Sequence, residues 1–245
     1  NCEFEKNKVL KGHCVSATEQ TSITIKESTF NDNGANSNGP VLYIHNPSST
    51  TTTTKATITN SIFENNGGKD VTDDNDDNSD TDTDDSDSGN DDDVGVVEVL
   101  GGVAYVGHNA HLQIEDSHFI DNGASYGGVV WGSGDYDNKN HIEITNSEFD
   151  HNSAYMGGAV MVTGEGCTTN ISTSRFINNV AGFTPLHTAE DMKGAAVFFR
   201  SILTASVSLC YFEMGKSETL NFIYAQDIVY TLPPPPPTSP SPSPS

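Results

Sequence analysis

Polar and apolar residues alternate with a period of two in a series of short segments. These segments lie at residues 22–25, 55–58, 111–114, 141–144, 170–172 and 206–209. A period of two is typical of a β-strand that buries one face and exposes the other to water. A helical period is not sustained over any long stretch of the chain. The pattern therefore predicts an all-β protein built from short strands.

A motif of the form SxFxxN follows these strands. Complete copies begin at Ser28, Ser61, Ser117, Ser147 and Ser174, and copies with Cys in place of Ser begin at Cys2 and Cys210. The motif phenylalanines recur about every thirty residues once an acidic stretch at residues 70–93 is set aside as an insertion. They are Phe4, Phe30, Phe63, Phe119, Phe149, Phe176 and Phe212. Asn-Gly pairs after several copies predict turns. The repeat predicts a parallel β-helix of about seven coils with an interior column of stacked Phe.

The motif also carries a family resemblance. SxFxxN, combined with the run Gly157-Gly158-Ala159-Val160, resembles the FxxN and GGA[ILV] repeats of the chlamydial polymorphic membrane proteins, and more broadly the right-handed β-helices of the pectin-lyase type. The similarity covers residues 1–215. It implies a right-handed parallel β-helix in residues 1–232 and a secreted, surface-displayed domain with an adhesive role.

A second set of predicted strands begins at glycine, and in these strands the residues of both faces are apolar. Aligning Gly39, Gly102, Gly128, Gly158 and Gly194 produces this set. A strand that is apolar on both faces is ordinarily covered on both. One side of the helix is therefore predicted to bind a partner, through the column Leu42, Tyr105, Trp131, Met161 and Val197. The alternative is that a loop of the same chain covers this side.

A proline-rich tail occupies residues 233–245, with five consecutive prolines followed by Ser-Pro alternation. Such a run favours an extended polyproline II rod, whose thirteen residues would reach about 40 Å, against about 34 Å for seven stacked coils. Because polyproline II rods bind aromatic-lined grooves, the tail of one copy is expected to dock on the apolar stripe of the next and so build a head-to-tail fibre. A linker to a further domain is the alternative.

The tail also resembles the hydroxyproline-rich segments of algal and plant wall glycoproteins. The resemblance implies covalent glycans on the tail, at Pro233, Pro234, Pro235, Pro236, Pro237, Pro240, Pro242, Pro244, Ser239, Ser241 and Ser243. Elsewhere an N-glycosylation sequon begins at Asn170. These features predict an extracellular protein of a cell wall or cell-surface appendage.

Charge restricts the partners. The formal net charge of −23 argues against nucleic acid, and no apolar run is long enough for a membrane span. The acidic insertion at residues 70–93 is typical of a solvated loop, with weak calcium binding as the alternative. An EF-hand is not expected, because alignment on Gly89 puts Gly95 where the motif needs Glu.

Cysteine and histidine offer further candidates. The four cysteines permit three pairings, and those nearest in sequence, Cys2 with Cys14 and Cys167 with Cys210, would staple the terminal coils. The spacing of His108 and His111 suits a metal, yet no Cys or third His accompanies them at a suitable interval. They are expected to be surface residues, and no cofactor or metal is predicted.

The enzyme hypothesis is tested by residue type. Lyases of acidic sugars need many basic residues, and this chain has eleven, of which only Arg175 and Arg200 are arginine. Glycosidases need two carboxylates about 5–9.5 Å apart, which Glu143, Glu148 and Asp150 could supply, although nothing distinguishes them from ordinary surface residues. We therefore predict no catalytic residue. The expected function is a self-assembling structural glycoprotein; an adhesin or glycan-binding β-helix is the alternative, and a glycoside-active enzyme is a distant third.

Overall fold

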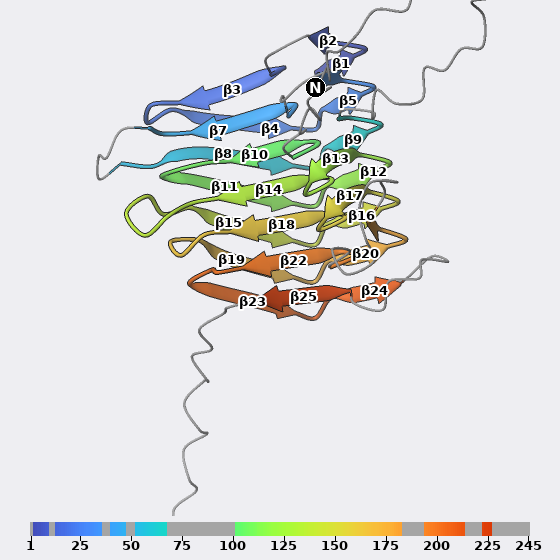
Figure 1. Ribbon diagram of the computed structural model, residues 1–245. Helices are drawn as coiled ribbons and strands as arrows, with labels where there is room; N and C mark the ends of the chain where they lie inside the picture. The colour runs from blue at the N-terminus through green and yellow to red at the C-terminus, as the bar shows by residue number, and fades with distance from the viewer. Residues whose placement is uncertain are drawn as a thin grey trace, which may run out of the picture.

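A computed structural model of the protein describes residues 2–9, 13–35, 40–47, 52–67, 101–182, 194–213 and 222–226. The acidic insertion and the proline-rich tail lie outside these residues. Every regular element within them is a β-strand, and every strand pairing is parallel. The chain cycles through three sheets as its coils stack from β1 at one end to β25 at the other (Figure 1). The predicted all-β parallel β-helix of about seven coils is confirmed.

Three large sheets form the sides of the helix. The Phe sheet contains β1 (Glu3–Glu5), β5 (Thr29–Asn31), β9 (Ile62–Glu64), β12 (His118–Ile120), β16 (Glu148–Asp150), β20 (Arg175–Ile177) and β24 (Tyr211–Glu213). The aromatic sheet contains β3 (Val15–Thr18), β7 (Leu42–His45), β10 (Ala104–Val106), β14 (Val130–Ser133), β18 (Val160–Thr163), β22 (Val197–Arg200) and β25 (Ile223–Gln226). The Ile sheet contains β4 (Ser22–Lys26), β8 (Thr54–Thr59), β11 (Ala110–Glu115), β15 (His141–Thr145), β19 (Thr168–Ser172) and β23 (Thr204–Ser208).

Two small sheets lie in the chain between the Phe sheet and the aromatic sheet. One contains β13 (Gly123–Tyr126), β17 (Ser153–Met156) and β21 (Val180–Ala181), and the other pairs β2 (Lys8–Val9) with β6 (Gly34–Ala35). A complete coil therefore runs from an Ile-sheet strand to a Phe-sheet strand, through a small-sheet strand, and on to an aromatic-sheet strand. The fourth coil, for example, uses β11, β12, β13 and β14 in that order.

The motif phenylalanines occupy one column in the interior. Each is the register partner of the Phe in the coil above and below, from Phe4 to Phe212. Their rings are stacked with centroid separations of 4.5–5.3 Å, and the five inner members are almost fully buried. Leu112, Ile114 and their counterparts in the Ile sheet, together with the inward residues of the aromatic sheet such as Ile44 and Val160, fill the rest of the core. The acidic insertion does not interrupt the column, because Phe63 pairs directly with Phe119.

The structure also explains the Ser and Asn of SxFxxN. Each motif Ser accepts the backbone N–H of the motif Ser one coil earlier and donates to the carbonyl two residues before itself; Ser147, for example, accepts from Ser117 and donates to the Thr145 carbonyl. The motif Asn side chains form a buried ladder in which Asn152 Oδ1 accepts both the backbone and the side-chain N–H of Asn122. The motif thus satisfies buried polar groups at the two ends of the Phe strand.

The turn chemistry differs from the sequence expectation. The motif Asn is an inward ladder residue, and the left-handed corner falls on the residue before it: Asp32, Asn65, Asp121, His151 and Asn178 all have positive φ. The Gly pair has a steric origin. Gly157 has a φ of 62°, and a Cβ on Gly158 would lie 2.2 Å from the Ala195 carbonyl oxygen of the next coil. Only glycine fits such close backbone approach.

Candidate functional site

The outer face of the aromatic sheet is the main candidate for binding. Register pairs place Ser16, Tyr43, Tyr105, Trp131, Met161, Phe198 and Tyr224 in one outward column. We call this column the aromatic face. Tyr43, Tyr105 and Trp131 are half-buried, with ring centroids 5.2 Å and 4.9 Å apart along the column.

The column expected from the sequence was wrong at its two ends. Leu42 and Val197 are register partners of Ala104 and Val160, and both side chains are fully buried in the interior. Register places Tyr43 and Phe198 in the outward column instead; Tyr43 is half-buried, and Phe198 is covered, with 1% of its surface exposed. The error came from the glycine alignment, since Gly194 corresponds to Gly157, the first Gly of its pair, and was aligned with the second. Tyr105, Trp131 and Met161 do lie in the column, and whether they bind a partner stays a prediction.

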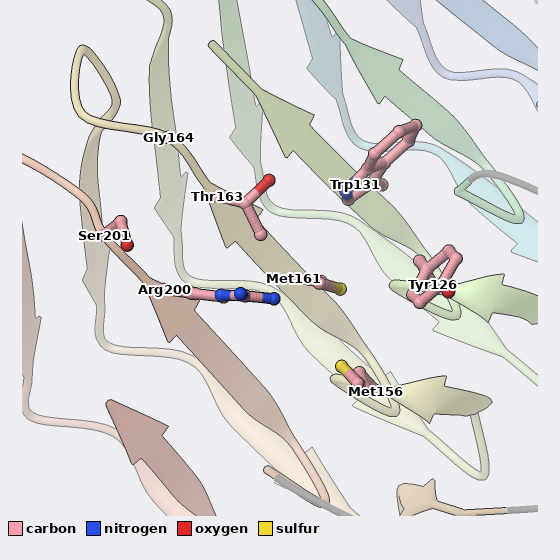
Figure 2. Close-up of a pocket in the computed structure, with 8 residues that line it drawn as sticks. All are labelled: Tyr126, Trp131, Met156, Met161, Thr163, Gly164, Arg200 and Ser201. Atoms are coloured by element: carbon pink, nitrogen blue, oxygen red, sulfur yellow. The ribbon is translucent and has the colours of Figure 1, made fainter. Parts of the chain in front are cut away.

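A hollow of about 390 Å³ interrupts the aromatic face below Trp131. Tyr126 of β13, Met156 of β17 and Met161 of β18 line it, together with Thr163, Gly164, Arg200 and Ser201. Figure 2 shows Arg200 reaching in from one side, opposite the rings of Trp131 and Tyr126. The hollow thus combines ring surfaces and thioethers with hydroxyl groups and a guanidinium group, a mixture that can hold an apolar ligand and orient its polar groups.

Sequence reasoning missed Tyr126, Met156 and Arg200. A signal was present for two of them, because Tyr126 and Met156 are register partners that each immediately precede a Gly pair. Arg200 carried no repeat signal, since its register partner in the preceding coil is Thr163.

Burial sets the protonation of the aromatic face. It raises the pKa of Tyr105 to about 12, with smaller contributions from Tyr43 and Cys167. It also lowers the pKa of His13, whose ring stacks on Tyr43 at 4.3 Å, and that of His45, to which His108 adds. At neutral pH both imidazoles are therefore uncharged, because the ordinary histidine pKa is already about 6.5.

The Trp131 indole carries an unmet hydrogen bond. Its Nε1–H is buried and has no partner among the described residues. A buried donor without an acceptor costs about 1–3 kcal/mol, so a ligand that offers an acceptor here would gain by satisfying it.

A second polar cluster lies on the outer face of the Ile sheet. His111 of β11 and His141 of β15 are register partners, and Glu143 of β15 lies between their imidazoles. His141 Nε2 is 3.0 Å from one carboxylate oxygen, and His111 Nε2 is 3.6 Å from the other. His108 and His111, which were expected to be surface residues, are both half-buried, and His108 lies beside His45 with ring centroids 5.3 Å apart.

The cysteines are unpaired. All four lie within the described residues as free thiols, and neither expected disulfide is formed. Cys2 and Cys210 take the place of the motif Ser at the two ends of the Ser ladder. The Cys210 thiol donates to the Ser208 carbonyl, as a motif Ser does, and the Cys167 thiol donates to the Thr163 carbonyl. Cys167 is fully buried, and burial raises the pKa of its thiol to about 12.

The remaining candidates are separated in space. Asn170 is exposed on β19, which is compatible with a glycan. Glu148 and Asp150 flank Phe149 on the Phe sheet, whereas Glu143 lies on the Ile sheet. Glu148 pairs with Arg175 at 2.7 Å, and Asp150 contacts His151 at 2.7 Å. The glycan positions of the tail and the carboxylates of the acidic insertion lie outside the described residues.

Comparison with known protein families, curated proteins and solved structures finds no match. Among the described residues there is also no helix that could cross a membrane.

Proposed function

We propose that the protein is an extracellular structural glycoprotein whose aromatic face docks the proline-rich tail of another copy, so that copies join into a fibre or surface coat. The observation that carries this proposal is the aromatic face itself. Tyr43, Tyr105 and Trp131 form a half-buried ladder that runs along the helix axis and leads into the hollow.

The repeat distances of the two partners agree. One polyproline II turn of three residues rises about 9.3 Å, and two coils of the β-helix rise about 9.6 Å. A tail laid parallel to the axis would therefore present the same proline edge to every second coil. This commensurate spacing lets successive prolines meet equivalent ring surfaces without stretching either partner.

Charge favours the tail over other segments of the chain. Two copies that each carry a net charge of −23 repel one another, so a contact between them is best made by uncharged segments. Residues 233–245 contain no charged side chain. The imidazoles of His13 and His45 on the aromatic face are uncharged at neutral pH because burial lowers their pKa. The polyproline II backbone has free carbonyls, which are acceptors of the kind that the unpartnered Trp131 N–H lacks.

A second function is an adhesin that holds a glycan in the hollow. Arg200, Thr163 and Ser201 supply hydrogen-bonding groups next to the Trp131 and Tyr126 rings, a combination suited to sugars. The resemblance of the repeats to the polymorphic membrane proteins supports the same reading. From the same resemblance we also propose that the β-helix of this protein is right-handed, as it is in that family.

Deletion of residues 233–245 separates the two functions. We expect the full chain to sediment as a concentration-dependent polymer and to form fibres under the electron microscope, and the deletion variant to be monomeric. Tyr105→Ala should also weaken assembly, whereas Tyr136→Ala, which removes an exposed tyrosine of the loop after β14 that is not a member of the column, should not. An unchanged polymer after deletion would contradict the tail-docking proposal. A monomeric full chain that binds glycans through Arg200 would favour the adhesin.

A further inference from the structure

We propose that His111, His141 and Glu143 form a binding site for a divalent first-row transition metal, Zn²⁺ in the first instance, on the outer face of the Ile sheet. The site is separate from the aromatic face and does not depend on the function proposed for it.

The β-helix itself brings the three side chains together. His111 and His141 occupy equivalent positions in strands of consecutive coils, so parallel pairing stacks them one above the other. Glu143 lies two residues after His141, on the same face of β15. One potential ligand atom from each residue lies within 4.8 Å of the others.

The spacing suits a tetrahedral metal. Zn–N and Zn–O bonds of about 2.0–2.1 Å place the ligand atoms of a tetrahedron about 3.3–3.4 Å apart. The two nitrogen-to-oxygen distances in the cluster, 3.0 Å and 3.6 Å, are close to that value and go to different oxygens of the Glu143 carboxylate. Side-chain rotation would draw the three ligand atoms, which lie within 4.8 Å of one another, around one ion, with solvent in the fourth position.

Hydrogen bonding points the lone pairs inward. The Thr168 hydroxyl can donate to the Asn140 carbonyl, which leaves it to accept the Nδ1–H of His141 at 2.5 Å. In this tautomer the His141 Nε2 lone pair faces Glu143 Oε1 at 3.0 Å, and a bound metal ion would take the place of the proton that otherwise joins these two atoms. Outer partners of this kind commonly fix the tautomer of a metal-ligating histidine.

His111 provides an independent observation. Its Nε2 is buried, points toward Glu143 and forms no hydrogen bond within the described part of the chain. Two imidazole nitrogens and one carboxylate are typical ligands of Zn²⁺, whereas Ca²⁺ and Mg²⁺ prefer an all-oxygen set. Lys55, the register partner of His111 on the other side, places one opposing positive charge near the site.

Calorimetric titration of the untagged full chain with ZnCl₂ tests the proposal. We expect a tight one-to-one phase in the wild type that is absent in His141→Ala and Glu143→Gln. His151→Ala is the matched control, because it removes a histidine that also contacts a carboxylate, at 2.7 Å, but on the Phe sheet. The acidic insertion is present in every variant, so any heat from metal binding to it is the same in all of them.

Two further variants distinguish a metal site from a cluster that only contributes hydrogen bonds to the fold. Thr168→Val should weaken Zn²⁺ binding about 10–100-fold through loss of the outer hydrogen bond. Lys55→Met should tighten it by removing the opposing charge. Circular dichroism verifies folding, and if His141→Ala does not fold, the Lys55→Met comparison decides. A wild-type chain without the tight phase, a tight phase unchanged in His141→Ala, or an affinity unchanged by Lys55→Met would overturn the proposal.

Discussion

Replacement of Asn152 by alanine probes the buried Asn ladder that the SxFxxN motif encodes. The Asn152 side chain accepts two hydrogen bonds from Asn122 and donates to the Phe119 carbonyl and to Asn179 Oδ1, all at 2.9–3.0 Å. Alanine leaves the Asn122 backbone N–H without its acceptor at a fully buried position. An orphaned N–H costs about 1–3 kcal/mol, and three further lost bonds cost about 0.5–1.5 kcal/mol each, so we expect about 2.5–7.5 kcal/mol in total.

The ladder supplies its own control at its exposed end. The Asn7 side chain donates only one bond, to Asn33 Oδ1 at 2.8 Å, and the residue is exposed. Asn7→Ala should therefore reduce the free energy of unfolding by less than about 1 kcal/mol. Urea denaturation followed by far-UV circular dichroism compares the two variants, with the denaturant slope checked for two-state behaviour. If both variants unfolded within about 0.5 kcal/mol of the wild type, the reasoning that assigns the motif Asn to a stabilising ladder would be refuted.

Three more predictions concern single buried side chains. Phe149→Ala should lower the unfolding free energy by about 3–5 kcal/mol in the same urea assay, because it leaves a cavity in the Phe column; a loss below about 1 kcal/mol would contradict the packing. Burial raises the pKa of Tyr105 to about 12, above its unfolded value, so this tyrosine favours the folded state below about pH 10 and loses that contribution as pH rises toward 12. Alkaline unfolding should thus begin at higher pH in Tyr105→Phe, and coincident curves would argue against it. Cys167, whose pKa burial raises to about 12, should resist iodoacetamide until the chain is unfolded, unlike the exposed Cys2 in mass-spectrometric mapping.

The coil repeat could be predicted because two independent sequence patterns report it. The alternation around Ile114 and Ile144 sets which face of the strand is buried, and the regular recurrence of Phe119 and Phe149 sets the coil length. Parallel stacking then forces equivalent residues into columns. Because both patterns are local, they predict the coils on either side of the acidic insertion without any information on long-range contacts.

Other features depend on geometry that a lone residue does not reveal. A single glycine such as Gly194 can match either member of a Gly pair, and a slip of one position turns every side chain of a strand to the opposite face. Because of that slip, the expected column contained Val197 in place of Phe198. The His111 and His141 pair escaped notice because metal-ligand spacing was sought within one segment, whereas a β-helix joins residues one coil apart.

The same limit applies to the Asn of SxFxxN. Its sequence context, followed by Gly in Asn122-Gly123, is that of a turn residue. Its role in the ladder arises only when coils are stacked, since both Oδ1 contacts come from the neighbouring coil. A polar motif residue that recurs once in each coil is thus better interpreted as part of a buried ladder than as a corner residue.

Trp131 is the one tryptophan of the chain, so its fluorescence reports directly on the aromatic face. The decisive measurement is a fluorescence titration of the variant lacking residues 233–245 with a synthetic peptide of that sequence. Docking on the aromatic face predicts a saturable spectral change that is weakened in Tyr105→Ala and unaffected by Tyr136→Ala. A Trp131 spectrum that does not respond to the peptide, or a response that is unchanged in Tyr105→Ala, would contradict the proposed assembly.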